Sequence, residues 1–236
     1  MTVDYQDLQI NGVRVETYGT PSAAPPLLFV HGGCQGSWAW EKMAPRLAGA
    51  GWYAVCLNWF GHHGSKVLPD RDAVSRSLLN VTTEIGLVTD WLGRAPVLVA
   101  HSMGGVPSLA YAGANPVTAV IQLAPVLPAG LGVAPIDLPV DPAAMWLPPP
   151  HMIDATFWGE VSAPEAQRYT SLLSAESPQA VPEATLANTP ARGGNPPPGQ
   201  LAAVLSARPP AAAGAHARDG ECTGWALSNS GRRCNR

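Results

Sequence analysis

The sequence predicts an α/β fold in which a mostly parallel sheet is flanked by helices. Short apolar runs, typical of buried parallel strands, alternate along the chain with segments of helical spacing. Two of these runs lead directly into glycine-rich turns, at residues 31–33 and 102–105. Apolar residues make up 46% and charged residues 13% of the 236 residues, which fits one domain with a sizeable core.

The predicted elements begin with a hairpin of two strands, about 5–10 and 13–18, around Asn11-Gly12. A helix over 38–49 is expected to end at Gly49 and Gly51, and a helix over 71–93 at Gly93. The helix over 103–114 ends before Asn115-Pro116, because the residue before proline disfavours helix. The remaining predicted strands cover 27–31, 52–59, 97–101 and 117–125.

Ser102 lies between a strand and a helix, in Ala100-His101-Ser102-Met103-Gly104. This is the pattern of a nucleophile elbow, G-x-S-x-G, with alanine in place of the first glycine. Small neighbours are needed there because the strand and helix backbones nearly touch. The alternative is a glycine-rich turn that contains an incidental serine.

A second turn follows the strand 27–30, in His31-Gly32-Gly33-Cys34. Together with the elbow, it resembles the α/β-hydrolase superfamily. More narrowly, residues 31–40 and 54–65 look like the small esterase, methylesterase and hydroxynitrile-lyase branch of that superfamily. The resemblance implies a mostly parallel sheet with a small helical cap. It also implies an oxyanion hole made by the backbone N–H groups of Gly33 and Met103.

Residues 58–65 resemble the loop that follows the next strand in this family, although Asn58 stands where an aspartate is usual. We interpret His62 and His63 as loop residues, neither catalytic nor metal ligands. Cys34 and Cys56 are expected to be small buried residues, since no CxxC spacing is present. The sequence carries no metal signature, and the predicted chemistry needs no cofactor.

Three regions are expected: a core over 1–125, a cap over 126–189 and a tail over 190–236. The cap contains short helical segments broken by prolines, and its aromatic and aliphatic content favours an apolar substrate group. The tail holds six prolines, seven glycines, ten alanines and six arginines, but only five large apolar residues. We expect it to be poorly ordered, by frameshift or divergence, with the core's C-terminal strands missing or degenerate. Its only candidate strand is 201–205, and an open sheet edge there could support a homodimer.

A serine hydrolase of this kind also needs an acid and a histidine, in the order Ser, acid, His. The only histidine after the cap is His216, and His151 in the cap is an alternative. Asp137 is the candidate acid, with Asp141 beside it. Asp219 follows His216, so it fits the chain order only if His216 is not the base. Four further acidic residues of the cap fit solvated helix faces better: Asp154, Glu160, Glu165 and Glu176.

The functional hypothesis is an esterase that acts on a small apolar ester through an acyl-Ser102 intermediate. The alternatives are an inactive hydrolase-fold remnant, a hydroxynitrile-type lyase, and a binding protein whose cap grips a small ligand. The net charge of −3 argues against nucleic acid or an anionic membrane as partner. No long apolar run or secretory leader is visible, so the cytosol is the expected location.

Overall fold

A computed structural model describes residues 3–126, 136–159, 161–185 and 201–205. Its strands are β1 (Tyr5–Ile10), β2 (Val13–Tyr18), β3 (Leu27–Val30), β4 (Ala54–Leu57), β5 (Val97–His101), β6 (Ala119–Leu123) and β7 (Leu201–Leu205). Its α-helices are α1 (Met43–Gly49), α2 (Asp70–Val74), α3 (Val81–Leu92), α4 (Gly105–Ala114), α5 (Pro150–Thr156), α6 (Ala163–Thr170) and α7 (Ala180–Thr185). Three 3₁₀ turns are η1 (Ser37–Trp40), η2 (Leu78–Asn80) and η3 (Ser102–Gly104).

The strands form one sheet in the order β1-β2-β4-β3-β5-β6-β7. Only the pairs β1–β2 and β2–β4 are antiparallel, and the other four pairs in the described sheet are parallel. The predicted mostly parallel sheet is therefore confirmed. The candidate strand 201–205 does pair, beside β6. The rest of the tail lies outside the described residues, and dimerisation through this edge stays a prediction.

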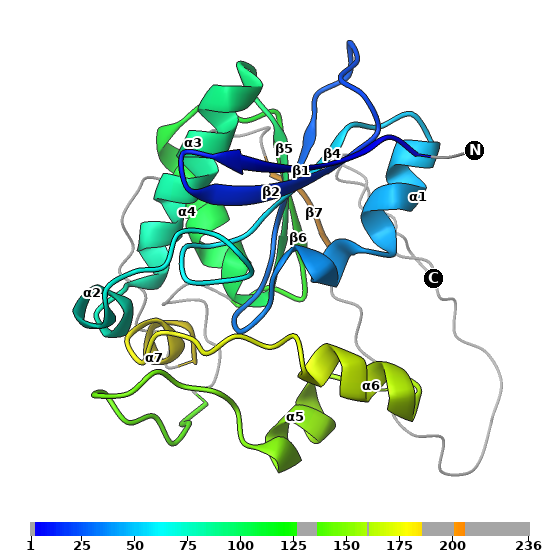
Figure 1. Ribbon diagram of the computed structural model, residues 1–236. Helices are drawn as coiled ribbons and strands as arrows, with labels where there is room; N and C mark the ends of the chain where they lie inside the picture. Colours follow the sequence, from blue (N-terminus) through cyan, green and yellow to red (C-terminus); the bar gives the residue numbers. More distant parts are fainter. Residues whose placement is uncertain (1–2, 127–135, 160, 186–200, 206–236) are drawn as a thin grey trace, which may run out of the picture.

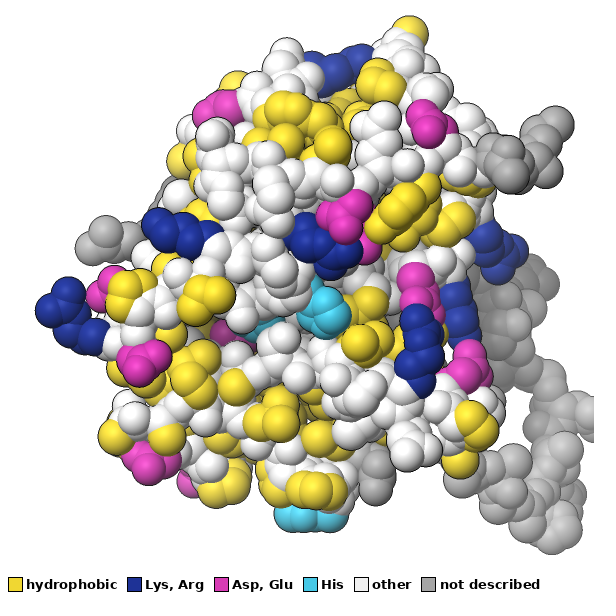
Figure 2. All heavy atoms as spheres, in the orientation of Figure 1, with side chains coloured by type: hydrophobic (Ala, Val, Ile, Leu, Met, Phe, Trp, Pro, Cys, Tyr) yellow, Lys and Arg dark blue, Asp and Glu magenta, His cyan; other side chains and the backbone are white. Residues whose placement is uncertain are grey.

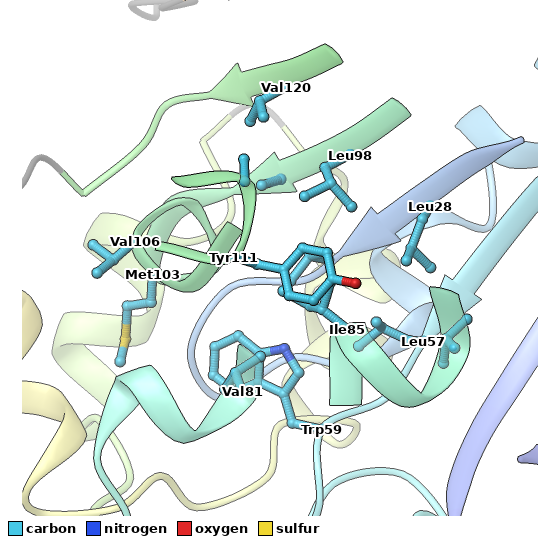
Figure 3. Packing of buried hydrophobic residues seen from close by; sticks show 14 of the residues in the cluster. Leu28, Leu57, Trp59, Val81, Ile85, Leu98, Met103, Val106, Tyr111 and Val120 are labelled. Atoms are coloured by element: carbon cyan, nitrogen blue, oxygen red, sulfur yellow. The ribbon is translucent and has the colours of Figure 1, made fainter. Parts of the chain in front are cut away.

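Helices cover both faces of the sheet, with α3 and α4 on one side and α1 on the other (Figure 1). Successive residues of β3 point to opposite faces, as the pleat requires. Leu28 and Val30 join the cluster under α3 and α4, while Leu27 and Phe29 join the cluster under α1. Figure 3 shows the first cluster, in which side chains of the strands meet those of α3 and α4. Because both faces are covered, all four residues of β3 are buried.

Two predicted helices are interrupted. The segment 71–93 divides into α2, η2 and α3, because Ser77 caps a new turn and Asn80 completes the capping box. The segment 38–49 divides into η1 and α1. The predicted helix 103–114 begins with η3 and continues as α4. The periodicity placed Ile85 and Val88 on a buried face, but it also included Met43 and Trp91, which are exposed, and it did not show these breaks.

The helices α5, α6 and α7 lie together beyond one end of the sheet, at the bottom of Figure 1. This arrangement is that expected of a helical cap, within the described residues 136–159 and 161–185, and the bounds 126–189 stay a prediction. On the face seen in Figure 2, positive and negative side chains alternate and neither sign forms a continuous patch. No helix in the described part of the chain is long and apolar enough to cross a membrane.

Candidate active site

Ser102 occupies the turn between β5 and α4 in the left-handed region, with φ of 49°. A non-glycine residue there is strained, and such strain persists only where the surroundings hold it. Gly104 makes the turn possible, because a Cβ at this position would lie 2.3 Å from the carbonyl oxygen of His31. The backbone of the turn after β3 therefore lies very close to the backbone of η3.

The turn after β3 lies directly against the elbow. A Cβ on Gly32 would lie 2.9 Å from Cβ of Ser102, and one on Gly33 would lie 2.2 Å from Sδ of Met103. Met103 stands at the start of the helix that follows, where the first N–H groups have no intrahelical acceptor. The two predicted oxyanion donors, Gly33 and Met103, are thus neighbours beside Ser102.

His31 and His101, the histidines at the two turns, have structural partners. Nδ1 of His31 lies 2.8 Å from the carbonyl of Gly32, and its Nε2 accepts the N–H of Trp59 at 3.1 Å. Burial and the nearby His62 lower the pKa of His31 well below its usual value, so the ring is neutral. Nδ1 of His101 lies 3.0 Å from Oε1 of Gln35, and burial lowers its pKa. Neither ring is placed to act as the base.

His62 lies in the loop after β4, as expected, but it is almost fully buried and faces Glu176. Nε2 of His62 lies 3.3 Å from Oε2 of Glu176, whose residue is only 2% exposed. Burial disfavours both charges, yet the mutual attraction raises the pKa of His62 and, with hydrogen bonds from backbone N–H groups, lowers the pKa of Glu176. The two residues are therefore placed to form a buried ion pair when His62 is protonated.

The prediction that Glu176 lies on a solvated helix face is therefore wrong. Glu176 lies between α6 and α7 in extended backbone, where it bridges to Trp146. A signal was present in the sequence, because Pro178 follows two residues later and disfavours helix before it. Glu165, in contrast, is on the exposed face of α6, where it pairs with Lys42.

An aromatic cluster joins the cap to the turn after β3. Trp38 of η1 stacks on Tyr169 of α6 with ring centres 5.5 Å apart, and Tyr169 stacks on Trp158 at 5.7 Å. Ile153 of α5 completes the cluster. Nε2 of His63 lies 3.0 Å from the carbonyl of Leu172, so this histidine also connects the core loop to the cap.

The structure leaves the acid and the base of the triad as predictions. Asp137 and Asp141 are exposed in the segment before α5, and His151 is exposed at the start of α5. Within the described residues, no histidine or carboxylate forms a hydrogen bond with Oγ of Ser102. His216, Asp219 and Glu160 lie outside the described residues, as does the side chain of Asp154.

Cys34 and Cys56 are buried free thiols, as expected. Asn58 is also structural: its Oδ1 accepts the N–H of Ser37 at 2.7 Å, and its amide donates to the carbonyl of Arg14. No group of three His, Cys, Asp or Glu side chains in the described ranges could hold a metal ion.

The chain is similar to several proteins with known activities. It is 33% identical over 85 residues to methylesterase 9 of Arabidopsis thaliana, a match that covers 34% of this chain and 31% of that protein. The chain therefore spans less than a third of this relative.

Solved structures with a similar fold include an epoxide hydrolase from Vigna radiata. Its TM-score is 0.45 and its sequence identity is 21%, and the match covers 56% of this chain and 44% of that one. A haloalkane dehalogenase from Agrobacterium tumefaciens has a TM-score of 0.44 and 27% identity, over 54% and 43% of the two chains. The family model described as alpha/beta hydrolase fold matches residues 25–157, more than half of the sequence. The chain belongs to the α/β-hydrolase fold family.

Proposed function

We propose that this hydrolase-fold chain is an esterase-type serine hydrolase that uses Ser102 as its nucleophile. The observation that carries the proposal is the strained Ser102, with φ of 49°, packed against Gly32. Strain of this kind concentrates at functional sites, where it presents a side chain to a substrate. The similarity to a methylesterase over 85 residues supports ester chemistry.

In the proposed reaction, Oγ of Ser102 attacks the ester carbonyl carbon and gives its proton to a base. The tetrahedral oxyanion accepts hydrogen bonds from the N–H groups of Gly33 and Met103. The intermediate collapses, the alcohol leaves with the proton from the base, and the acyl group stays on Ser102. Water then attacks the acyl-enzyme by the same steps and releases the acid.

The proposed base is His216 and the proposed acid is Asp137. The proposed substrate is a small apolar ester, on the basis of the aromatic and aliphatic residues in the cap sequence. Buried free thiols at Cys34 and Cys56 fit the proposed location in the cytosol.

A second candidate is a hydrolase-fold protein that binds a small ligand without turnover. It is favoured by one observation, that no base reaches Ser102 within the described residues. Removing a triad member lowers the rate by several powers of ten, so a chain without the base would show little activity.

Labelling with a fluorophosphonate probe distinguishes the two. We expect the purified protein to label, the Ser102→Ala variant not to label, and the His216→Ala and Asp137→Asn variants to label far more slowly. A folded wild-type protein that does not label would overturn the esterase proposal and favour the binding protein. Full labelling of His216→Ala would remove that residue from the mechanism.

A further inference from the structure

Glu176 holds the turn that contains the predicted oxyanion donor. The residue belongs to the cap return, residues 171–179, which connects α6 to α7. Its Oε2 accepts the N–H of Cys34 at 3.2 Å, and its Oε1 accepts the N–H of Ser177 at 3.0 Å. Its backbone is fixed by two hydrogen bonds with Trp146, of 2.8 and 2.7 Å.

Cys34 immediately follows Gly33 and is held by the cap return from both sides. Besides the bond from its N–H to Glu176, its carbonyl accepts the N–H of Ser174 at 2.9 Å. Cys34 has φ of 62°, a conformation that a residue with a side chain rarely adopts. Since this strain needs external support, the cap return keeps the turn in its observed shape.

His62 completes the arrangement from the core side. Its Nε2 lies 3.3 Å from the same Oε2 that accepts the Cys34 N–H. A buried carboxylate without a counter-charge would be costly, so His62 allows Glu176 to stay ionised next to the turn. The cap return, the loop after β4 and the turn after β3 therefore meet at one carboxylate.

We propose that Glu176 is a positioning residue, which holds the Gly33-Cys34 segment in the conformation that aims the Gly33 N–H at the oxyanion. The effect on the oxyanion rests on the proposed function, whereas the effect of Glu176 on the shape of the Gly33-Cys34 turn does not. A cap segment that closes the site is then also needed to shape the machinery beneath it.

The substitution Glu176→Gln tests this with little change in volume. The carboxylate accepts one backbone N–H at each oxygen, but an amide has only one acceptor oxygen. Whichever way the amide is turned, its NH₂ group faces the N–H of either Cys34 or Ser177. Glu165→Gln is the matched control, because it makes the same change in the cap on an exposed side chain.

Cys34 itself reports on the turn. In a Cys222→Ser/Cys234→Ser background, the two remaining thiols are Cys34, 2% exposed, and Cys56, fully buried in β4. We expect Glu176→Gln to increase the reaction rate of Cys34 with Ellman's reagent at least 10-fold while Cys56 stays protected. Glu165→Gln should leave both thiols protected. An amide that keeps its oxygen toward Cys34 would leave the Cys34 rate unchanged, so Glu176→Ala, which removes both acceptors, decides the test. An unchanged Cys34 rate in Glu176→Ala, or equal exposure of both thiols, would overturn the proposal.

Labelling of Ser102 then gives the catalytic consequence. We expect fluorophosphonate labelling of Glu176→Gln to be slower by roughly 10-fold or more, since the oxyanion loses an aligned donor. Selective exposure of Cys34 in a protein that never labels would uphold the positioning role and reject the esterase proposal. Selective exposure with an unchanged labelling rate would reject the link between Glu176 and the oxyanion hole.

Hydrogen exchange of the wild-type protein needs no variant to fold. The Cys34 amide lies in a loop, yet it donates to a buried carboxylate, so we expect it to exchange as slowly as amides of β3. Exchange at the rate of an exposed loop amide would contradict the proposed role of Glu176.

Discussion

Two of the charged contacts between the cap and the core differ in their exposure to water, one being buried and the other lying on the surface. The buried contact is His62 with Glu176, whose side chains are 3% and 2% exposed. The exposed contact is formed by α6, where Arg168 binds Glu41 at 2.6 Å and Glu165 binds Lys42 at 2.7 Å.

The two contacts contribute differently to stability, because water weakens the exposed contact and does not reach the buried one. Exposed ion pairs are screened and contribute little, so α6 is held mainly by the packing of Tyr169 on Trp38. A buried pair is costly to form but strongly destabilising to break. The charged contact that fixes the cap's geometry is therefore the one beside the candidate active site.

The largest loss of stability is expected for Glu176→Gln. The change removes one partner of a buried pair and leaves a backbone donor unpaired, which should lower the free energy of unfolding by about 3 kcal/mol. The melting temperature should fall by roughly 6–12 °C. Urea unfolding at pH 6 measures this, with Glu165→Gln as the control. A loss no larger than that of the control would refute the buried pair as the main charged contact.

A change of pH is expected to alter the free energy of unfolding through the same pair, His62 and Glu176, by less than the substitution Glu176→Gln does. The raised pKa of His62 adds stability that is complete below about pH 6.5 and is lost as pH rises through the folded pKa. The lowered pKa of Glu176 adds stability that is complete above about pH 4.5 and is lost as pH falls through the folded pKa. The difference between wild type and Glu176→Gln should therefore be greatest between pH 4.5 and 6.5.

Unfolding free energies at pH 5.5 and pH 9 measure this window. The stability difference between wild type and Glu176→Gln should be smaller at pH 9 than at pH 5.5, because the contribution of His62 is lost as pH rises through its raised folded pKa. In a His62→Gln background, the decline above pH 6.5 should disappear. A difference that is the same at both pH values would show that His62 does not carry a charge in the folded protein.

The contrast between the two contacts also explains what sequence could predict. The strands depend on local patterns, such as four apolar residues before His31-Gly32-Gly33, and the predicted mostly parallel sheet is confirmed. The role of Ser102 in the elbow stays a prediction. The positions of Gly33 and Met103 follow from the same two turns. Glu176 and Cys34 are 142 residues apart, and no local pattern pairs them. The break at Ser77 was also missed, because apolar spacing continues across it.

The smallest effect is expected for Arg168→Gln on the exposed contact. The substitution removes two hydrogen bonds to Glu41. Because both side chains are already accessible to water, the melting temperature should fall less than in Glu176→Gln. In 1 M NaCl, where the screening length is about 3 Å, Arg168→Gln should melt at nearly the wild-type temperature. The deficit of Glu176→Gln should persist there, because salt does not reach a buried pair. If 1 M NaCl removed the difference in melting temperature from wild type equally for both variants, the distinction between the buried and the exposed contact would be wrong. The charges that hold the cap would then all be accessible to solvent.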